Sequence, residues 1–248
     1  MNLKGVLAAV AMAGSANAAD VNVMSTGAVK GPFTEASDKW SKDTGNKVTA
    51  SFDPAGPLRQ KLAAGVRGDI VIMPVESFAA LEKDGLVVPG TRRDFGAVSM
   101  GVAVKEGAAV PDISTVEALK KTLREAKTVT YMDPEKGSSG KYFDTTVLPR
   151  LGMRDEVRAK TKLGQGGSVG DIVAKGEADI AFQNVTELLP VKGVKVVGLL
   201  PAELQSPIVY SGAVMKDAKN PREAQQLLDY LASAAGRRIF VDHGFAAP

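Results

Sequence analysis

The sequence predicts an α/β protein of two lobes, each a mostly parallel sheet flanked by helices. Short β-rich runs alternate with segments of helical period, and the alternation changes at residues 96–104, where no helix directly follows an apolar run. About 230 residues follow the first segment, which is enough for one large domain or two small ones. No repeat or long linker is visible, so we expect two or more strands to join the lobes.

The first part of the chain alternates strand and helix in a βαβαβ order. The expected strands cover residues 21–24, 48–52 and 69–73, and the expected helices cover 32–44, 57–64 and 77–83. Phe33, Ala36 and Trp40 fall on one face of the first helix, which Gly45 ends. Pro57 suits the first turn of the second helix. This order implies a parallel sheet with right-handed crossovers.

The apolar strand at 96–104 is expected to cross into the second lobe. There the expected helices are 114–126, 138–151 and 169–175, and the expected strands are 128–132, 179–183 and 195–200. Ser114 and Glu117 have the spacing of a capping box. A strand at 208–215 leads back, and helices at 221–234 and 236–243 close the chain. We therefore expect residues 19–98 with 208–248 to form one lobe, and 99–207 the other.

The first residues have the pattern of a secretory signal peptide. Lys4, an apolar run over 5–13 and Ala16-Asn17-Ala18 predict a segment 1–18 that is cleaved after Ala18, and hence an exported, periplasmic protein. No later segment approaches the roughly 18 apolar residues of a membrane helix, so no stable membrane insertion is expected. The chain has no cysteine, which excludes thiolate catalysis, disulfides and thiolate metal sites.

Charge and histidine content narrow the chemistry further. The 31 Lys and Arg and 28 Asp and Glu are well mixed, which indicates a solvated surface and not a nucleic-acid interface. We interpret the single histidine, His243, as a cation at a helix C-terminus, so Ser-His-Asp chemistry is not expected. No metal site is expected, because zinc needs clustered His or Cys ligands and pairs such as Asp53 with Asp69 have no distinctive spacing.

A turn at Gly137-Ser138-Ser139-Gly140-Lys141 resembles the phosphate-binding loop only in part. The loop needs a glycine where this chain has Glu135, and Ser or Thr where it has Tyr142, so nucleotide hydrolysis is not supported. The turn still offers backbone N–H groups, two hydroxyls and a lysine to an anion. The alternative is an ordinary helix cap by Ser138 or Ser139.

Two turns of the first lobe, 25–30 and 53–57, also join a strand to a helix. Ligands of parallel sheets bind beyond the carboxyl ends of the strands. We therefore expect the three turns to face a common cleft, with Lys30 and Arg59 near its rim or floor.

These segments resemble the periplasmic substrate-binding proteins of molybdate-type ABC transporters. The matching stretches cover nearly the whole chain after the signal: 21–48, 51–62, 133–142, 176–179, 207–210 and 219–245. The resemblance implies a type II periplasmic binding protein fold, with a ligand cleft that closes between the lobes by a hinge motion. It also implies a monomer without a cofactor that captures a small anion for a membrane transporter.

Particular ligand contacts are implied by the same resemblance. The family's two serines fall at Ala28 and Ala55, where the hydroxyls are missing, although Ser25 or Thr26 lies close enough to substitute; a backbone amide contact falls within 166–168. The expected ligand-binding residues are Thr26, Gly27, Ala28, Lys30, Ala55, Gly56, Arg59, Ser138, Ser139, Lys141, Ser168 and Tyr210.

Three readings of function follow. Loss of the serines beside Lys30, Arg59 and Lys141 favours an organic di- or tricarboxylate as the ligand, because guanidinium binds carboxylate through two parallel hydrogen bonds. Molybdate or tungstate binding is one alternative. The other is an enzyme similar to the aconitate isomerases, which share this scaffold, with Lys141, Tyr210 or Glu76 as proton carrier.

Overall fold

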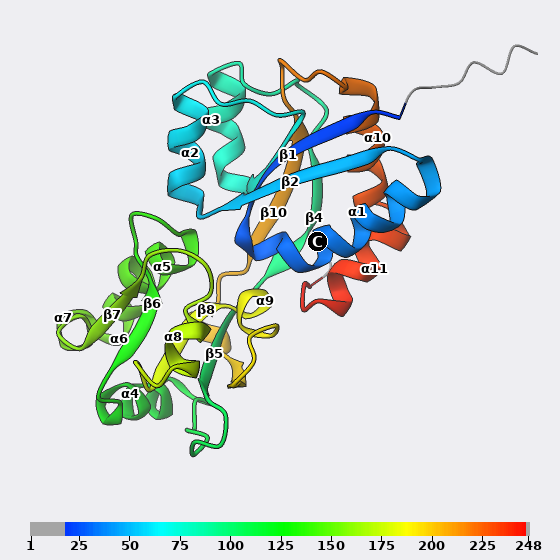
Figure 1. Cartoon of the computed structure of the whole chain (residues 1–248). Coiled ribbons are helices and arrows are strands. Elements are labelled where there is room, and N and C mark those ends of the chain that lie inside the picture. Colours follow the sequence, from blue (N-terminus) through cyan, green and yellow to red (C-terminus); the bar gives the residue numbers. More distant parts are fainter. Residues whose placement is uncertain (1–17, 247–248) are drawn as a thin grey trace, which may run out of the picture.

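Two five-stranded sheets, one in each lobe, organise the chain (Figure 1). The computed structural model describes residues 18–246. The predicted signal peptide therefore lies outside the described residues, apart from Ala18. The expected α/β class with two lobes is confirmed.

The first sheet has the strand order β2-β1-β3-β10-β4. Its strands are β1 (Asp20–Thr26), β2 (Lys47–Asp53), β3 (Ile70–Pro74), β4 (Arg93–Val98) and β10 (Ile208–Val214). Strand β1 pairs in parallel with β2 and β3, whereas β10 runs antiparallel between β3 and β4. Strands β1 and β2 thus point their carboxyl ends at the second lobe (Figure 1).

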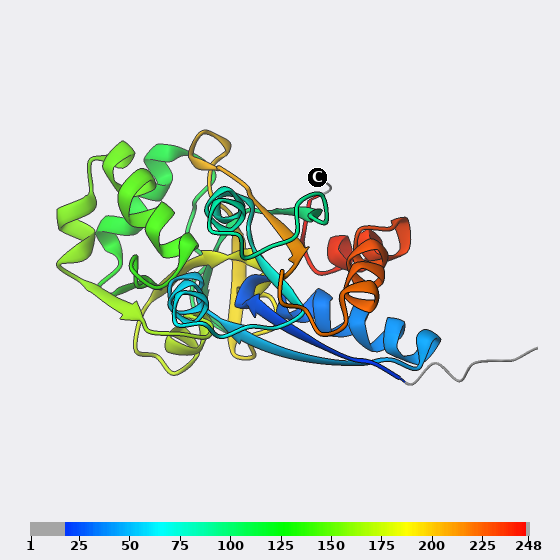
Figure 2. The same ribbon diagram turned by 90° about the horizontal axis from the view of Figure 1, so that it is seen from above.

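Five helices cover this sheet: α1 (Lys30–Thr44), α2 (Ala55–Ala63), α3 (Phe78–Lys83), α10 (Pro221–Leu231) and α11 (Ala234–Asp242). Helix α1 buries Phe33, Ala36 and Trp40 as expected, and ends at Gly45, whose φ of 75° suits glycine. Helices α10 and α11 pack beside α1 (Figure 2). A short 3-10 turn, Gly27–Val29, links β1 to α1 and brings the backbone to the edge that faces the second lobe.

The second sheet has the order β7-β6-β8-β5-β9. Its strands are β5 (Met100–Lys105), β6 (Val129–Met132), β7 (Thr161–Gly164), β8 (Ile180–Asn184) and β9 (Val194–Leu199). Strand β6 pairs in parallel with β7 and β8, and β5 runs antiparallel between β8 and β9. Its helices are α4 (Val116–Glu125), α5 (Ser138–Tyr142), α6 (Leu148–Leu151), α7 (Arg154–Arg158), α8 (Gly170–Ala174) and α9 (Val185–Leu188).

Several expected elements differ from the structure. The apolar run at 96–104 forms two strands in different sheets, β4 and β5, which separate at Ser99. Thr115, not Ser114, caps α4, because its hydroxyl accepts from the backbone N–H of Ala118. The helix expected at 138–151 contains a π-helical turn at Phe143–Val147. Strand β7 and helices α7 and α9 are too short to show a clear period in the sequence.

The lobes are connected twice, through Ser99 and through residues 200–207. We propose the predicted boundaries, 98/99 and 207/208, as the limits of the lobes, because β4 ends directly before the first boundary and β10 begins directly after the second. None of the helices between residues 18 and 246 combines the length and apolar character that crossing a bilayer requires.

A buried ionic network holds the second lobe together away from the cleft. Asp144 is fully buried and accepts hydrogen bonds from Tyr131, Arg154 and Arg158. Burial alone would raise the pKa of the Asp144 carboxyl, but the bonds from Arg158, Arg154 and Tyr131 outweigh burial and lower the pKa to about 2. The ionised carboxylate is therefore the form that the fold stabilises.

This network predicts a loss of stability in acid. A carboxyl whose pKa is lowered on folding stabilises the protein above its unfolded pKa, 3.8, and this stabilisation is lost as the pH falls toward 2. The difference corresponds to about 2 kcal/mol. We expect Asp144→Asn to unfold more easily at pH 7 and to lose less stability than the parent between pH 5 and pH 3, measured by urea unfolding. An equal loss in both proteins would contradict this role of Asp144.

Candidate functional site

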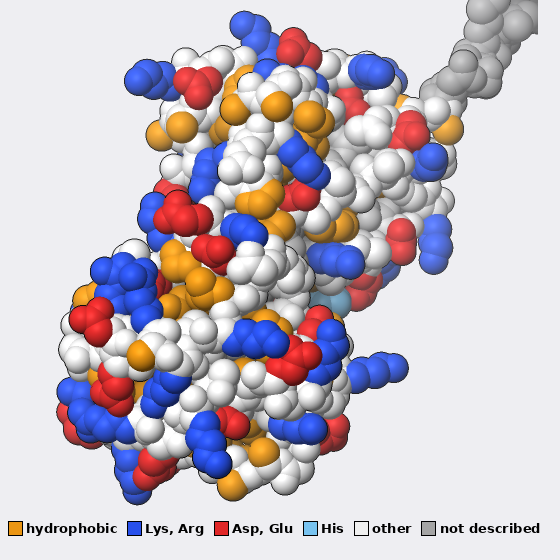
Figure 3. Space-filling view, turned by 60° about the vertical axis from the view of Figure 1, so that its left-hand side comes forward, with side chains coloured by type: hydrophobic (Ala, Val, Ile, Leu, Met, Phe, Trp, Pro, Cys, Tyr) orange, Lys and Arg blue, Asp and Glu red, His pale blue; other side chains and the backbone are white. Residues whose placement is uncertain are grey.

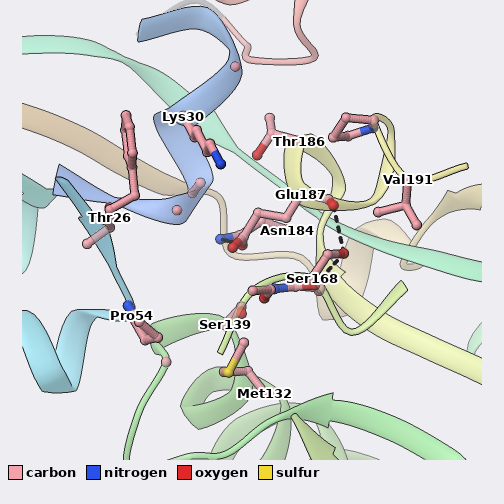
Figure 4. A pocket seen from close by; sticks show the side chains of 18 of the residues that line it. Thr26, Lys30, Pro54, Met132, Ser139, Ser168, Asn184, Thr186, Glu187 and Val191 are labelled. Carbon is pink, nitrogen blue, oxygen red and sulfur yellow. Dashed lines mark hydrogen bonds between the residues drawn. The ribbon is translucent and has the colours of Figure 1, made fainter. Parts of the chain in front are cut away.

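A cavity of about 900 Å³ lies between the two lobes. The first lobe contributes the turn after β1, the start of α1 and the end of β2, and the second contributes the start of α5, the loop before α8, the end of β8 and α9. Figure 4 shows Thr26 and Lys30 on one side and Ser139, Ser168 and Glu187 on the other. The cavity thus occupies the position expected from the carboxyl ends of parallel strands.

Nine of the twelve expected ligand-binding residues line this cavity. They are Thr26, Gly27, Ala28, Lys30, Ala55, Ser138, Ser139, Ser168 and Tyr210. All three strand-to-helix turns of the sequence prediction therefore contribute to one space.

The structure does not bring Arg59, Lys141 or Glu76 to the cavity. All three side chains are exposed and lie outside its lining. Arg59 follows Leu58, which is buried, so the helix turns Arg59 toward solvent. Lys141 likewise follows a buried residue, Gly140 on α5, and its side chain is turned toward solvent.

Gly56 lies beside the cavity and joins the lobes. Its backbone N–H donates to the backbone carbonyl of Lys136 over 2.7 Å. A Cβ atom at Gly56 would lie only 2.4 Å from the carbonyl oxygen of Glu135. Only glycine allows this close approach of the two lobes.

Two residues that line the cavity have buried hydroxyls without a hydrogen-bond partner among residues 18–246. Thr26 and Thr186 both line the cavity, and the Oγ1 atom of each is buried and unpaired. A buried hydroxyl without a hydrogen bond destabilises the folded protein unless a ligand or water supplies the missing partner. No side chain caps the start of α5 at Gly137 either, so Ser138 and Ser139 present their N–H groups on the same side.

Glu187, like Asn184 and Thr186 beside it, lines the cavity but was missed by the sequence analysis. Its Oε2 atom accepts a hydrogen bond of 2.9 Å from Asn184. Burial raises the pKa of the Glu187 carboxyl to about 7, although hydrogen bonds from Asn184 and Gln183 oppose the rise. The spacing from Asn184 to Glu187 is that of a capping box, and this signal could have located α9 directly after β8.

Tyr210 and Ser168 hold α9 in place. Asn184 Nδ2 also donates to the Tyr210 hydroxyl over 3.0 Å, and Ser168 Oγ donates to the backbone carbonyl of Glu187 over 2.8 Å. Burial first, and then the nearby Glu187, raises the pKa of Tyr210, so its phenol stays protonated at neutral pH. Ser168 is therefore engaged in positioning Glu187.

Charged groups of both signs surround the mouth of the cavity. Lys30 and Lys192 are exposed at its wall, and Lys30 Nζ lies 5.8 Å from the centre of the Phe52 ring. Besides Glu187, the acidic residues that line the cavity are Glu35, Asp38, Asp53 and Asp171. Figure 3 shows the same intermixing of charge over a face of the molecule.

His243 lies at the end of a helix, as expected, and also has a hydrogen-bond partner on another helix. His243 is the C-cap of α11, and its Nε2 atom lies 2.8 Å from Glu35 Oε2 on α1. The ring also packs against Gly31. His243 thus lies behind the cavity wall, and residues 18–246 contain no group of three His, Asp or Glu placed to hold a metal ion.

Comparison with known proteins agrees with this architecture. A family model described as bacterial extracellular solute-binding protein matches residues 21–246. The chain is 33% identical over 229 residues to an aconitate isomerase of Pseudomonas sp., covering 90% of this chain and 86% of the isomerase. It is 26% identical over 247 residues to the molybdate-binding protein ModA of Azotobacter vinelandii, covering 96% and 94% of the two chains.

A solved structure supports the fold independently. The periplasmic molybdate-binding protein of Azotobacter vinelandii superposes with a TM-score of 0.79 at 21% identity, over 92% of this chain and 99% of that one. The two-lobed architecture and the family match agree along nearly the full described length. The chain therefore belongs to the bacterial extracellular solute-binding proteins.

Proposed function

We propose that the cavity between the lobes binds an organic di- or tricarboxylate. The observation that carries the proposal is that donors for an anion and apolar side chains share one cavity. Thr26, Thr186 and the open start of α5 supply the donors, while Met132 and Val191 supply apolar walls (Figure 4). Apolar walls suit the carbon skeleton of an organic acid and offer nothing to an inorganic oxyanion.

Capture then follows from closure of the lobes. The donors come from both lobes, so the site is complete only when the lobes meet, and the ligand stabilises that state. We propose that the closed protein, in the periplasm, delivers its ligand to an ABC transporter. This role requires affinity and closure but no chemical step.

A thermal-shift panel tests the proposal on the chain that starts at Ala19. We expect tricarballylate, citrate or the aconitates to raise the melting temperature, since a ligand at a hundredfold excess over its Kd adds about 2.7 kcal/mol of stability. Succinate, molybdate, tungstate, sulfate and phosphate complete the panel. A shift with molybdate or tungstate alone would overturn the proposal in favour of an oxyanion-binding protein.

The pKa of Glu187 favours a second candidate, an isomerase of cis- and trans-aconitate. That reaction moves a proton between two carbons of an allylic system, and a group with a pKa near 7 is suited to carry it. The similarity to the Pseudomonas isomerase supports this candidate. Of the expected proton carriers only Tyr210 lines the cavity, and its phenol stays protonated, so Glu187 takes the place of Glu76 and Lys141 as the candidate.

Proton NMR of cis-aconitate with the purified protein tests the second candidate. An isomerase would produce trans-aconitate and, in deuterated water, exchange a carbon-bound proton. Glu187→Gln would then lose about 10²- to 10⁴-fold in rate. If cis-aconitate is converted no faster with the protein than in buffer alone, the isomerase candidate is contradicted and ligand capture remains the proposed function.

A further inference from the structure

Glu187 places a carboxyl in the same cavity as the donors for an anion. It lies on α9 in the second lobe, and its Oε1 atom is 3.1 Å from where a Cβ of Gly27, in the first lobe, would stand. Its Oε2 atom is occupied by Asn184. Oε1 is therefore the oxygen that faces the turn of the first lobe.

The charges that share the cavity with Glu187 come from every surrounding element. They are Lys30, Glu35 and Asp38 on α1, Asp53 at the end of β2, Asp171 on α8, Lys192 after α9, and the phenol of Tyr210 on β10. Asp53 is neutralised by Lys61 at 2.7 Å, and Glu35 is paired with His243. Lys30, Glu35, Asp38, Asp171 and Lys192 are all exposed, so solvent screens them.

An ionised Glu187 would repel the ligand that the rest of the cavity is built to accept. A protonated carboxyl presents an O–H donor in the same place and adds to the hydroxyls of Thr26 and Thr186. We propose that Glu187 binds the ligand in its protonated form, donating from Oε1 to a ligand carboxylate, so that anion capture takes up one proton. This inference rests on the proposed binding of carboxylates and does not depend on catalysis.

The direction of the pH dependence follows from linkage. The pKa of Glu187 is about 7 in the free protein, and an anion beside the carboxyl raises it further. Above pH 7 the free carboxyl is ionised, so binding must recruit a proton and affinity falls about tenfold per pH unit. Below pH 7 Glu187 already carries the proton in the free protein, so its titration no longer changes the affinity.

Titration calorimetry with tricarballylate tests the inference, because this saturated tricarboxylate has no double bond to isomerise. Titrations in two buffers of different ionisation enthalpy at pH 8 give the number of protons taken up. We expect close to one proton for the parent protein and an affinity that falls about 50-fold from pH 7 to pH 9. In Glu187→Gln, which keeps a donor but cannot titrate, we expect no proton uptake and no such fall.

His243→Gln is the matched control, because it removes the single histidine, which lies outside the cavity lining and contacts the lining residue Glu35. We expect it to keep the proton uptake of the parent. Tight binding without proton uptake, or uptake that survives in Glu187→Gln, would overturn the inference and leave carboxylate capture standing. Absence of binding by every carboxylate of the panel between pH 6 and pH 9 would overturn both.

Discussion

Gly56→Ala is expected to weaken ligand binding about 100-fold without destabilising the unliganded protein. The new Cβ would lie 2.4 Å from the carbonyl oxygen of Glu135, and this oxygen belongs to backbone that cannot rotate away. This clash destabilises the closed state by about 2 to 3 kcal/mol relative to the open state, which weakens ligand affinity roughly 100-fold. In the open state alanine favours α2, because glycine is the poorer residue inside a helix.

Gly166→Ala is the matched control for this prediction. Gly166 lies in the loop of the second lobe that faces Pro54, and a Cβ there would meet only the Pro54 side chain at 3.9 Å. Calorimetry with tricarballylate and thermal unfolding without it separate the two effects. Equal affinity in Gly56→Ala and the parent would show that closure does not bring these backbones together.

Gly140→Ala is expected to destabilise the second lobe by about 3 kcal/mol. A Cβ at this position would lie 1.8 Å from the carbonyl oxygen of Met132, at the end of β6. Helix α5 rests directly on that strand end, so the added methyl must push the helix off the sheet. Thermal unfolding should show a melting temperature lower by about 6 to 12 °C.

Lys141→Ala on the same helix is the control. Lys141 is exposed and outside the cavity, so we expect neither its melting temperature nor its affinity for tricarballylate to change measurably. A large loss of affinity in Lys141→Ala would restore this lysine to the binding site. A melting temperature unchanged in Gly140→Ala would show that α5 can move off β6 at little cost.

The order of helices and strands could be predicted from the sequence because the spacing of apolar residues and the residues that end each element indicate the same boundaries. In α1, for example, the apolar spacing of Phe33, Ala36 and Trp40 ends at Gly45, and each signal indicates the same boundary. The turns after β1 and β2 followed from that order, and with them the position of the cavity.

The direction of single side chains could not be predicted in the same way. One residue turns by about 100° around a helix, so Arg59 and Lys141 leave the cavity although their neighbours pack toward the sheet. Glu187 stayed hidden because α9 has only four residues, which is too few to show a helical period in the sequence. Its raised pKa depends on burial between lobes that are distant in sequence, which no local pattern records.

The place of β10 in the first sheet has a consequence for synthesis on the ribosome. Among the strands of residues 18–246, β4 pairs only with β10, which begins at residue 208; Ala97 of β4 also bridges to Ala246. All five strands of the second sheet, between residues 100 and 199, therefore emerge before the first sheet can close. The lobe that is second along the chain is expected to finish folding first, because the N-terminal strands cannot complete their sheet until β10 is synthesised.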